Sequence, residues 1–146
     1  MKNSHIGCIA VILCSAIAGA QQPAAVEKRG FNSIVKYEHF LSGHLTELNG
    51  KYKFRVTETT YSPGGFIGEH HHAGPGVRLV VSGTLTYVQP DTTRVFGPGE
   101  YFYESGDVTH TAYNKTSAPV VILNFELLPA GWNGASTIPP VIKTMH

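Results

Sequence analysis

The sequence predicts an all-β fold, either a sandwich or a barrel, and three observations lead to this class. Turn-forming Gly, Pro, Asn, Asp and Ser residues recur about every eight to twelve positions, which is the spacing of short strands. The segments between these turns are rich in β-branched and aromatic residues. No segment shows a sustained helical period of apolar residues. A chain of 146 residues is expected to form one domain around one core.

The strands follow from the local patterns. Residues 51–61 are the clearest, because Tyr52, Phe54 and Val56 alternate with polar residues; we expect the apolar face to meet the core and the polar face to meet water. Residues 77–81 are apolar on both faces apart from Arg78, which predicts a strand buried between layers. Further strands are expected within residues 31–48, after a turn at 62–65, and at 84–89, 94–96, 101–104, 108–113 and 119–127.

The first twenty residues have the pattern of a secretory signal peptide. Lys2 gives a basic start, an apolar run follows that is too short to span a bilayer, and Ala18-Gly19-Ala20 offers a cleavage site. The alternative is a buried N-terminal helix or a membrane anchor. We expect residues 1–20 to be removed and the protein to be secreted or periplasmic, with no membrane attachment afterwards. The remaining divisions are a flexible leader (21–30), the β domain (31–128) and a C-terminal tail packing on the barrel (129–146).

Composition limits the chemistry of the mature chain. Both cysteines, Cys8 and Cys14, lie in the predicted signal, so we expect neither a disulfide nor a thiolate ligand. Removing Lys2 with the signal leaves ten basic residues, 11 minus 1, against ten acidic ones, and no basic cluster suggests nucleic acid. A small-molecule substrate or ligand is therefore the expected partner.

Three consecutive histidines suggest a metal site. Side chains alternate along a strand, so His70 and His72 share one face while His71 points away. Two imidazoles on one face can bind one metal ion, and His110 follows in a later strand. The alternative is an accidental cluster of surface histidines.

Taken together, the glycine and histidine spacings resemble those of the cupin family. The first motif of the family is matched by Gly64, His70, His72 and Gly83, and the second by Gly99, His110 and Asn114. Two departures in the second motif are Ser105 in place of its proline and Asp107 in place of its second glycine. The resemblance implies a cupin-type double-stranded β-helix, that is, a jelly-roll barrel.

The resemblance also implies a metal centre with His70, His72 and His110 as ligands. The glutamate of the first motif is missing, because Gly76 stands at its position. One divalent ion is expected, with iron favoured and zinc, manganese, nickel and copper as alternatives. The opposing interpretation is a degenerate, empty site.

Two charged residues are candidates for catalytic roles beside the metal. Arg78 is two residues after Gly76 and faces the same interior if the strand is regular, where it could hold the anionic end of a substrate. The alternatives are an ion pair with Glu69 or Glu104, or an outward orientation. Glu104 could replace the missing ligand or act as an acid or base, and otherwise would be a rim carboxylate.

These features predict an exported mononuclear metal-binding cupin of the oxygenase type, such as a dioxygenase, acting on a small oxygen-chelating organic compound. The absence of cysteine from the mature chain argues against the thiol-dioxygenase variant that depends on a cysteine–tyrosine crosslink. The alternatives are a non-catalytic module that binds a metal or small ligand, and a metal-dependent isomerase or lyase. The resemblance further implies a homodimer, for which residues 31–41 are the candidate interface.

Overall fold

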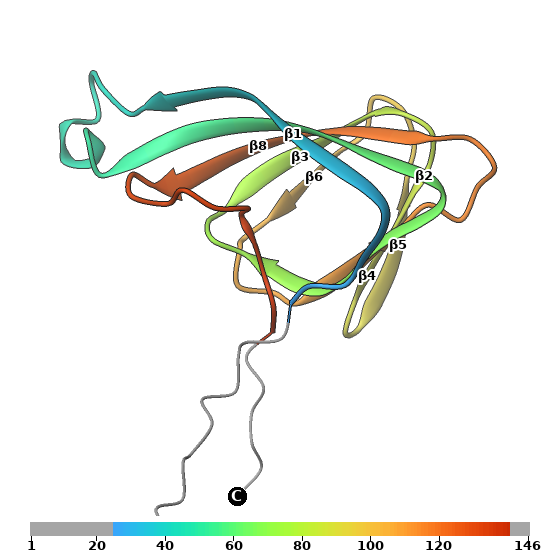
Figure 1. Ribbon diagram of the computed structural model, residues 1–146. Helices are drawn as coiled ribbons and strands as arrows, with labels where there is room; N and C mark the ends of the chain where they lie inside the picture. The colour runs from blue at the N-terminus through green and yellow to red at the C-terminus, as the bar shows by residue number, and fades with distance from the viewer. Residues whose placement is uncertain (1–24, 141–146) are drawn as a thin grey trace, which may run out of the picture.

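The computed structural model describes residues 25–140, in which nine strands form a curved sheet that nearly closes into a barrel (Figure 1). The elements are β1 (Lys28–Phe40), η1 (Thr46–Leu48), β2 (Tyr52–His72), β3 (Gly76–Ser82), β4 (Leu85–Gln89), β5 (Thr92–Phe96), β6 (Tyr101–Glu104), β7 (His110–Tyr113), β8 (Val120–Pro129) and β9 (Thr137–Ile138). The predicted all-β class is confirmed. The predicted signal peptide lies outside the described residues. Within residues 25–140 no helix has the length and apolar character needed to cross a membrane.

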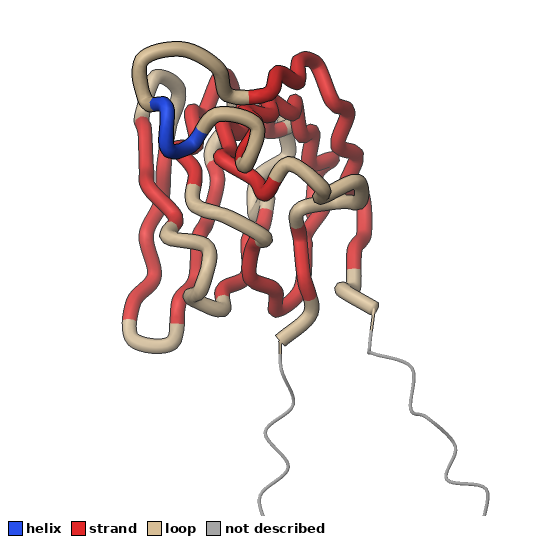
Figure 2. The backbone as a smooth tube through the Cα atoms, turned by 90° about the vertical axis from the view of Figure 1, so that its left-hand side faces the viewer, coloured by secondary structure: helices blue, strands red, loops and turns tan. Residues whose placement is uncertain are grey.

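The long strand β2 organises the barrel. The strand order is β5-β4-β7-β2-β8-β3-β6, and both β1 and β9 pair with β2 as well. The first half of β2 pairs with β8, whereas its second half pairs with β7 and β9. β2 therefore contributes to both sides of the barrel, whose strands and connecting loops are traced in Figure 2.

The expected turn at residues 62–65 is a bend within β2, so that prediction was wrong. Gly64 has a φ of +69°, a left-handed conformation that glycine adopts without steric cost. The backbone amide of Asn114 donates to Gly65 O over 2.8 Å, and Gly64 N donates to Asn114 O over 3.1 Å. The buried Asn114 side chain donates further bonds to Tyr61 O and Ala118 O. The asparagine of the second motif thus holds the corner of β2.

The two faces of β2 are the reverse of those predicted. Lys53 and Arg55 are buried, with 2% and 6% exposure, whereas Phe54 is 51% exposed. Charged side chains can occupy the interior only when they are paired. Glu38 of β1 provides the pairing, because its Oε1 lies 3.1 Å from Lys53 Nζ and accepts a bond from Arg55 Nε over 2.8 Å.

β3 is also not buried on both faces as predicted. Its inward-facing Arg78 is 1% exposed, but Val77 and Val81 on the opposite face are 40% and 47% exposed. The neighbouring strands continue this apolar outer face with Phe125 and Tyr103, which are cross-strand partners of Val77. Among the described residues no second layer covers this face, so the barrel has a single wall here.

The chain ends differ in detail from the expected divisions. β1 begins at Lys28, inside the segment 21–30 expected to be a leader, because Lys28 already pairs with Ile67. At the other end β8 reaches Pro129, and the tail then returns to form β9 beside His71 and His72. The two ends of the described chain consequently lie together at one end of the barrel (Figure 1).

An apolar core fills the interior next to the histidines. It consists of Tyr61, Ile67, Val80, Leu85, Tyr87, Phe96, Phe102, Ala112, Val120 and Ile122. Interiors packed to this extent keep their side chains in fixed rotamers. The core therefore packs against the polar site with side chains in fixed positions.

Two motif glycines should respond differently to alanine. Both have left-handed φ values, +77° for Gly83 and +83° for Gly99, so each substitution should cost about 1–2 kcal/mol of unfolding free energy. At Gly83 a methyl group would also overlap β8, with Val120 Cα only 2.8 Å away, whereas nothing lies within 4 Å at Gly99. We expect Gly83→Ala to destabilise clearly more than Gly99→Ala in urea unfolding. Equal costs would contradict the close packing of Gly83 against β8.

Candidate metal centre

Three histidines converge on one point inside the barrel. β2 contributes His70 and His72 from the same face, and β7 contributes His110, the cross-strand partner of His70. One ligand nitrogen from each lies within 4.8 Å of the others, so the three could hold one metal ion. His71 instead lies beside Ile138 of β9 and is not part of the cluster. The structure thus brings together the three predicted ligands.

Each imidazole has its Nδ1 bonded to an oxygen acceptor outside the cluster of ligand nitrogens. His70 Nδ1 donates to Gly68 O over 2.8 Å and His110 Nδ1 donates to Val108 O over 3.0 Å. A carbonyl oxygen only accepts, so Nδ1 carries a proton in both rings; when such a ring is neutral, its Nε2 has the lone pair that binds a metal ion. His72 Nδ1 lies 3.1 Å from the Glu126 carboxylate. This is the arrangement in which outer partners orient metal-binding histidines.

The surroundings shift the pKa values of His70 and His72 in opposite directions. Burial, together with the neighbouring His110 and His72, lowers the pKa of His70 to about 3, so this ring is neutral and ready to bind a cation. Burial also opposes the charge on His72, but its bonds to Glu104 and Glu126 raise its pKa above the ordinary value.

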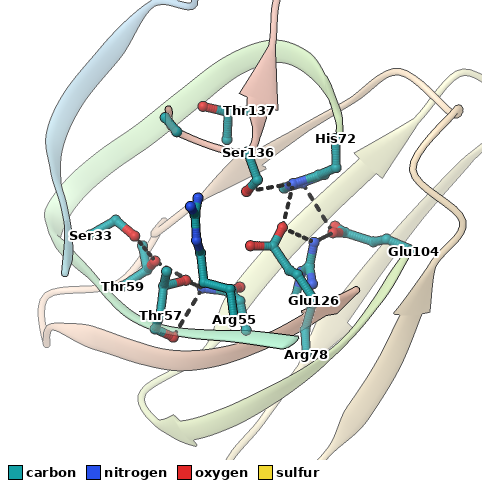
Figure 3. Close-up of polar contacts among 12 residues, drawn as sticks. Ser33, Arg55, Thr57, Thr59, His72, Arg78, Glu104, Glu126, Ser136 and Thr137 are labelled. Carbon is teal, nitrogen blue, oxygen red and sulfur yellow. Dashed lines mark hydrogen bonds and ion pairs between the residues drawn. The ribbon is translucent and has the colours of Figure 1, made fainter. Parts of the chain in front are cut away.

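Glu104 and Arg78, the two predicted catalytic residues, both lie in this cluster (Figure 3). Glu104 Oε1 is 3.0 Å from His110 Nε2, and Oε2 is 3.1 Å from His72 Nε2. Arg78 Nη2 is 2.6 Å from Glu104 Oε2. Burial disfavours the charge on Glu104, yet Arg78 and the two histidines outweigh it and hold its pKa well below the usual range. Glu104 is thus an ionised buried carboxylate facing the ligand nitrogens.

The structure explains the glycine at the position of the motif glutamate. Gly76 lies between two glutamates, because its cross-strand partners are Glu104 on β6 and Glu126 on β8. A Cβ at Gly76 would overlap Arg78 Nη1 and lie 2.6 Å from Phe125 O. The Arg78 guanidinium therefore occupies the space that a glutamate would need, and the carboxylates come from the adjacent strands instead.

Sequence reasoning did not identify Glu126. This residue is 1% exposed, and its Oε1 lies 3.1 Å from His72 Nδ1 and 3.2 Å from Arg78 Nη2. Burial disfavours its charge, but His72 and Arg78 together lower its pKa. The alternation of Val120 and Ile122 with outward residues places Glu126 and Asn124 on the inner face. The alternation along this strand was visible in the sequence, but polar residues in a strand are usually assigned to the solvent-exposed face.

Two neighbouring cavities lie in this part of the barrel, one at the cluster and one beside it. The inner chamber, of about 40 Å³, is lined by the histidines, Glu104, Glu126 and the core residue Tyr87. The outer chamber, of about 350 Å³, lies between β1, β2 and residues 133–137 of the tail. The two chambers share Phe31, Ser33, Thr57, Ser136 and Thr137 as lining residues. Tyr61 and Tyr87 line the inner chamber, whereas Tyr101 and Tyr103 are exposed on the outer face.

Glu126 should affect metal affinity through His72. We expect Glu126→Gln to weaken metal binding about 10–100-fold, because an amide orients the imidazole less firmly than a carboxylate. Glu69→Gln is the matched control, since Glu69 lies on β2 with an exposed side chain. The measurement is competition for zinc with a chelator of known affinity. Equal affinities for the two variants would show that Glu126 does not position the ligand.

Comparison with known proteins gives a family and a fold. Residues 57–126 match the sequence model of the family described as "Cupin domain". These residues include both histidine motifs from His70 to Asn114. No curated protein matches the chain significantly.

Several solved structures share the fold. The polyketide cyclase RemF from Streptomyces resistomycificus aligns with a TM-score of 0.56 at 19% identity, covering 79% of this chain and 75% of that one. A conserved protein with a double-stranded β-helix domain from Klebsiella pneumoniae aligns at 0.53 and 19% identity, covering 75% and 84%. A cupin domain from Bordetella pertussis aligns at 0.51 and 21% identity, covering 70% and 98%. The family match thus identifies residues 57–126 as a cupin domain, and these likenesses show that the barrel has the cupin fold.

Proposed function

We propose that this protein is an exported, mononuclear metal-dependent oxygenase that acts on a small compound with chelating oxygen atoms. The observation that carries the proposal is the convergence of three imidazoles, each with its Nδ1 tied to an acceptor, on a chamber that also contains Glu104. His70, His72 and His110 would hold the ion, with Glu104 close enough to be a further ligand. An ion held this way has positions left for dioxygen and for substrate, and supplies the redox or Lewis-acid chemistry.

The charges of the inner chamber favour an anionic ligand. When the histidines are neutral, as metal binding requires, Arg78 contributes one positive charge and Glu104 and Glu126 two negative ones; a divalent ion would change this sum from −1 to +1. An enolate or a carboxylate would neutralise that excess. Arg78 Nη1 is buried and has no hydrogen-bond partner among residues 25–140, so it is available to a substrate oxygen. We assign Arg78 to binding the anionic group and Glu104 to proton transfer beside the ion.

A second candidate is a metal-dependent isomerase or lyase, and one observation favours it. Glu104 and Glu126 both contact His72, which places two carboxylates that could exchange protons at the same site. Such a reaction needs the ion only as a Lewis acid and consumes no dioxygen.

Metal analysis and oxygen uptake distinguish these candidates. Protein isolated from its natural host is analysed for metals and then tested in an oxygen electrode with catechols, β-diketones and hydroxy acids. Iron with oxygen uptake supports the oxygenase. Zinc with turnover but no uptake supports the isomerase or lyase, and metal without any turnover leaves a binding module. A protein that takes up no metal at all contradicts both enzymatic proposals.

Export and dimer formation are part of the proposal. Amino-terminal sequencing of the protein from the host's secreted or periplasmic fraction should find Gln21 as the first residue, and an intact Met1 would contradict export. Dimer formation is supported by β1, whose apolar residues Ile34, Val35, Tyr37 and Phe40 are each about half exposed. Light scattering tests it, and a monomer at micromolar concentration would contradict it.

A further inference from the structure

We propose that the outer chamber contains a second binding site, in which Lys28, Ser33 and Thr57 bind the distal carboxylate of the substrate. This inference rests on the proposed function, because the other end of the same molecule would chelate the metal in the inner chamber. It specifies the substrate class as a short aliphatic dicarboxylic acid that carries a hydroxyl or keto oxygen beside one carboxylate.

The hydrogen bonds of a cluster of hydroxyl groups leave two donors unused. Asn124 Nδ2 lies 3.0 Å from Thr57 Oγ1, 2.9 Å from Thr59 Oγ1 and 3.4 Å from the carbonyl oxygen of Thr57. Because a carbonyl only accepts, the nitrogen of the amide must point this way, and it donates to both hydroxyls. Thr59 in turn donates to Ser33 Oγ over 2.9 Å.

The direction of these hydrogen bonds determines which hydroxyl groups of the cluster can donate to a ligand. The Thr57 hydroxyl accepts from Asn124 and the Ser33 hydroxyl accepts from Thr59, so each keeps its own proton. Among residues 25–140 neither proton has an acceptor, although both residues line the outer chamber. Two hydroxyl donors facing one cavity suit an oxygen acceptor such as a carboxylate.

A positively charged side chain, that of Lys28, borders the same cavity. Lys28 lines the outer chamber, and its Nζ donates to Thr137 Oγ1 over 3.1 Å. No acidic side chain forms an ion pair with Lys28 in the described part of the chain, whereas Lys36 and Lys53 pair with Glu58 and Glu38. Arg55 also borders the chamber, but its guanidinium is occupied by Glu38 and by the tail carbonyls of Trp132 and Gly134. Lys28 is therefore the cation available to a ligand.

The position of the site relates it to the metal centre. Ser33 and Thr57 line both chambers, so a molecule bound to them reaches from the outer chamber toward the histidines. The close-up shows the hydroxyls of Ser33, Thr57 and Thr59 on one side of Arg55 and the charged cluster of His72 and Glu126 on the other (Figure 3). The chamber offers one aromatic ring, that of Phe31, so it suits an aliphatic acid better than a flat aromatic one.

Three hydroxy acids with the same chelating end test the proposal. Lactate, malate and phenyllactate are titrated into the protein loaded with Co²⁺, whose visible absorption changes when a ligand reaches the ion. Malate should bind at least about tenfold more tightly than lactate, because a charge-assisted site holds its second carboxylate. Phenyllactate should bind no more tightly than lactate.

Variants identify the residues responsible. Lys28→Met and Thr57→Val should each reduce malate affinity toward that of lactate while leaving lactate affinity unchanged. Lys36→Met is the matched control, since Lys36 lies on the same strand but pairs with Glu58. Thr57 also accepts a hydrogen bond from Asn124, so thermal unfolding must show that the Thr57→Val variant is folded. Lys28 is exposed, so its substitution by methionine is not expected to affect folding. Equal binding of malate and lactate to the cobalt protein overturns the second site alone. Failure to take up cobalt overturns the proposed function as well.

Discussion

Replacing His110 by alanine is expected to abolish metal binding. The wild-type protein should retain about one divalent ion per chain after dialysis, since three imidazoles and a carboxylate surround one point. Removing His110 takes away the only ligand from β7 and leaves Glu104 Oε1 without its partner at 3.0 Å. Elemental analysis of the dialysed variant should find less than a tenth of the wild-type metal.

The neighbouring histidine gives the matched control. His71→Ala removes an imidazole from the same strand, but this side chain lies beside Ile138 and outside the cluster. Its metal content should equal that of the wild type. Equal losses in both variants would mean that metal binds elsewhere, and retention in both would mean that His110 is not a ligand.

Replacing Arg78 by methionine is expected to destabilise the protein by about 3–5 kcal/mol, the usual cost of breaking a buried ion pair. Arg78 is 1% exposed and its Nη2 contacts both Glu104, at 2.6 Å, and Glu126, at 3.2 Å. Without the guanidinium the two buried carboxylates lose their permanent positive partner, and among residues 25–140 His72 is the one group still in contact with both. Urea unfolding of the metal-free protein measures this cost directly.

A surface ion pair provides the comparison for Arg78. Lys36→Met breaks the exposed pair with Glu58, which should cost less than about 1 kcal/mol because water screens it. Added zinc should reduce the cost of Arg78→Met, since the ion would replace part of the missing positive charge, and should leave the Lys36→Met cost unchanged. Similar costs for the two variants without metal would contradict the central role of Arg78.

Two of the candidate metal ligands, His70 and His72, were predictable from the sequence because their spacing is local. His70 and His72 are two residues apart on one strand, and strand geometry alone places them on one face. His110 was identified through the second motif rather than through any local rule. The polar interior was not predictable in this way, because Lys53 and Arg55 follow a pattern that normally denotes a solvent-exposed face.

The sequence by itself determined the all-β class, the positions of most strands and the three histidines, since alternation and turn residues act over a few neighbours. Only the tertiary structure decided which face of each strand is inside. Glu126 and Glu104 enter the site as cross-strand neighbours of Gly76, and the tail residues Ser136 and Thr137 enter it by folding back beside β2. Burial of a charged residue depends on partners far along the chain, and only the packed barrel brings those partners together.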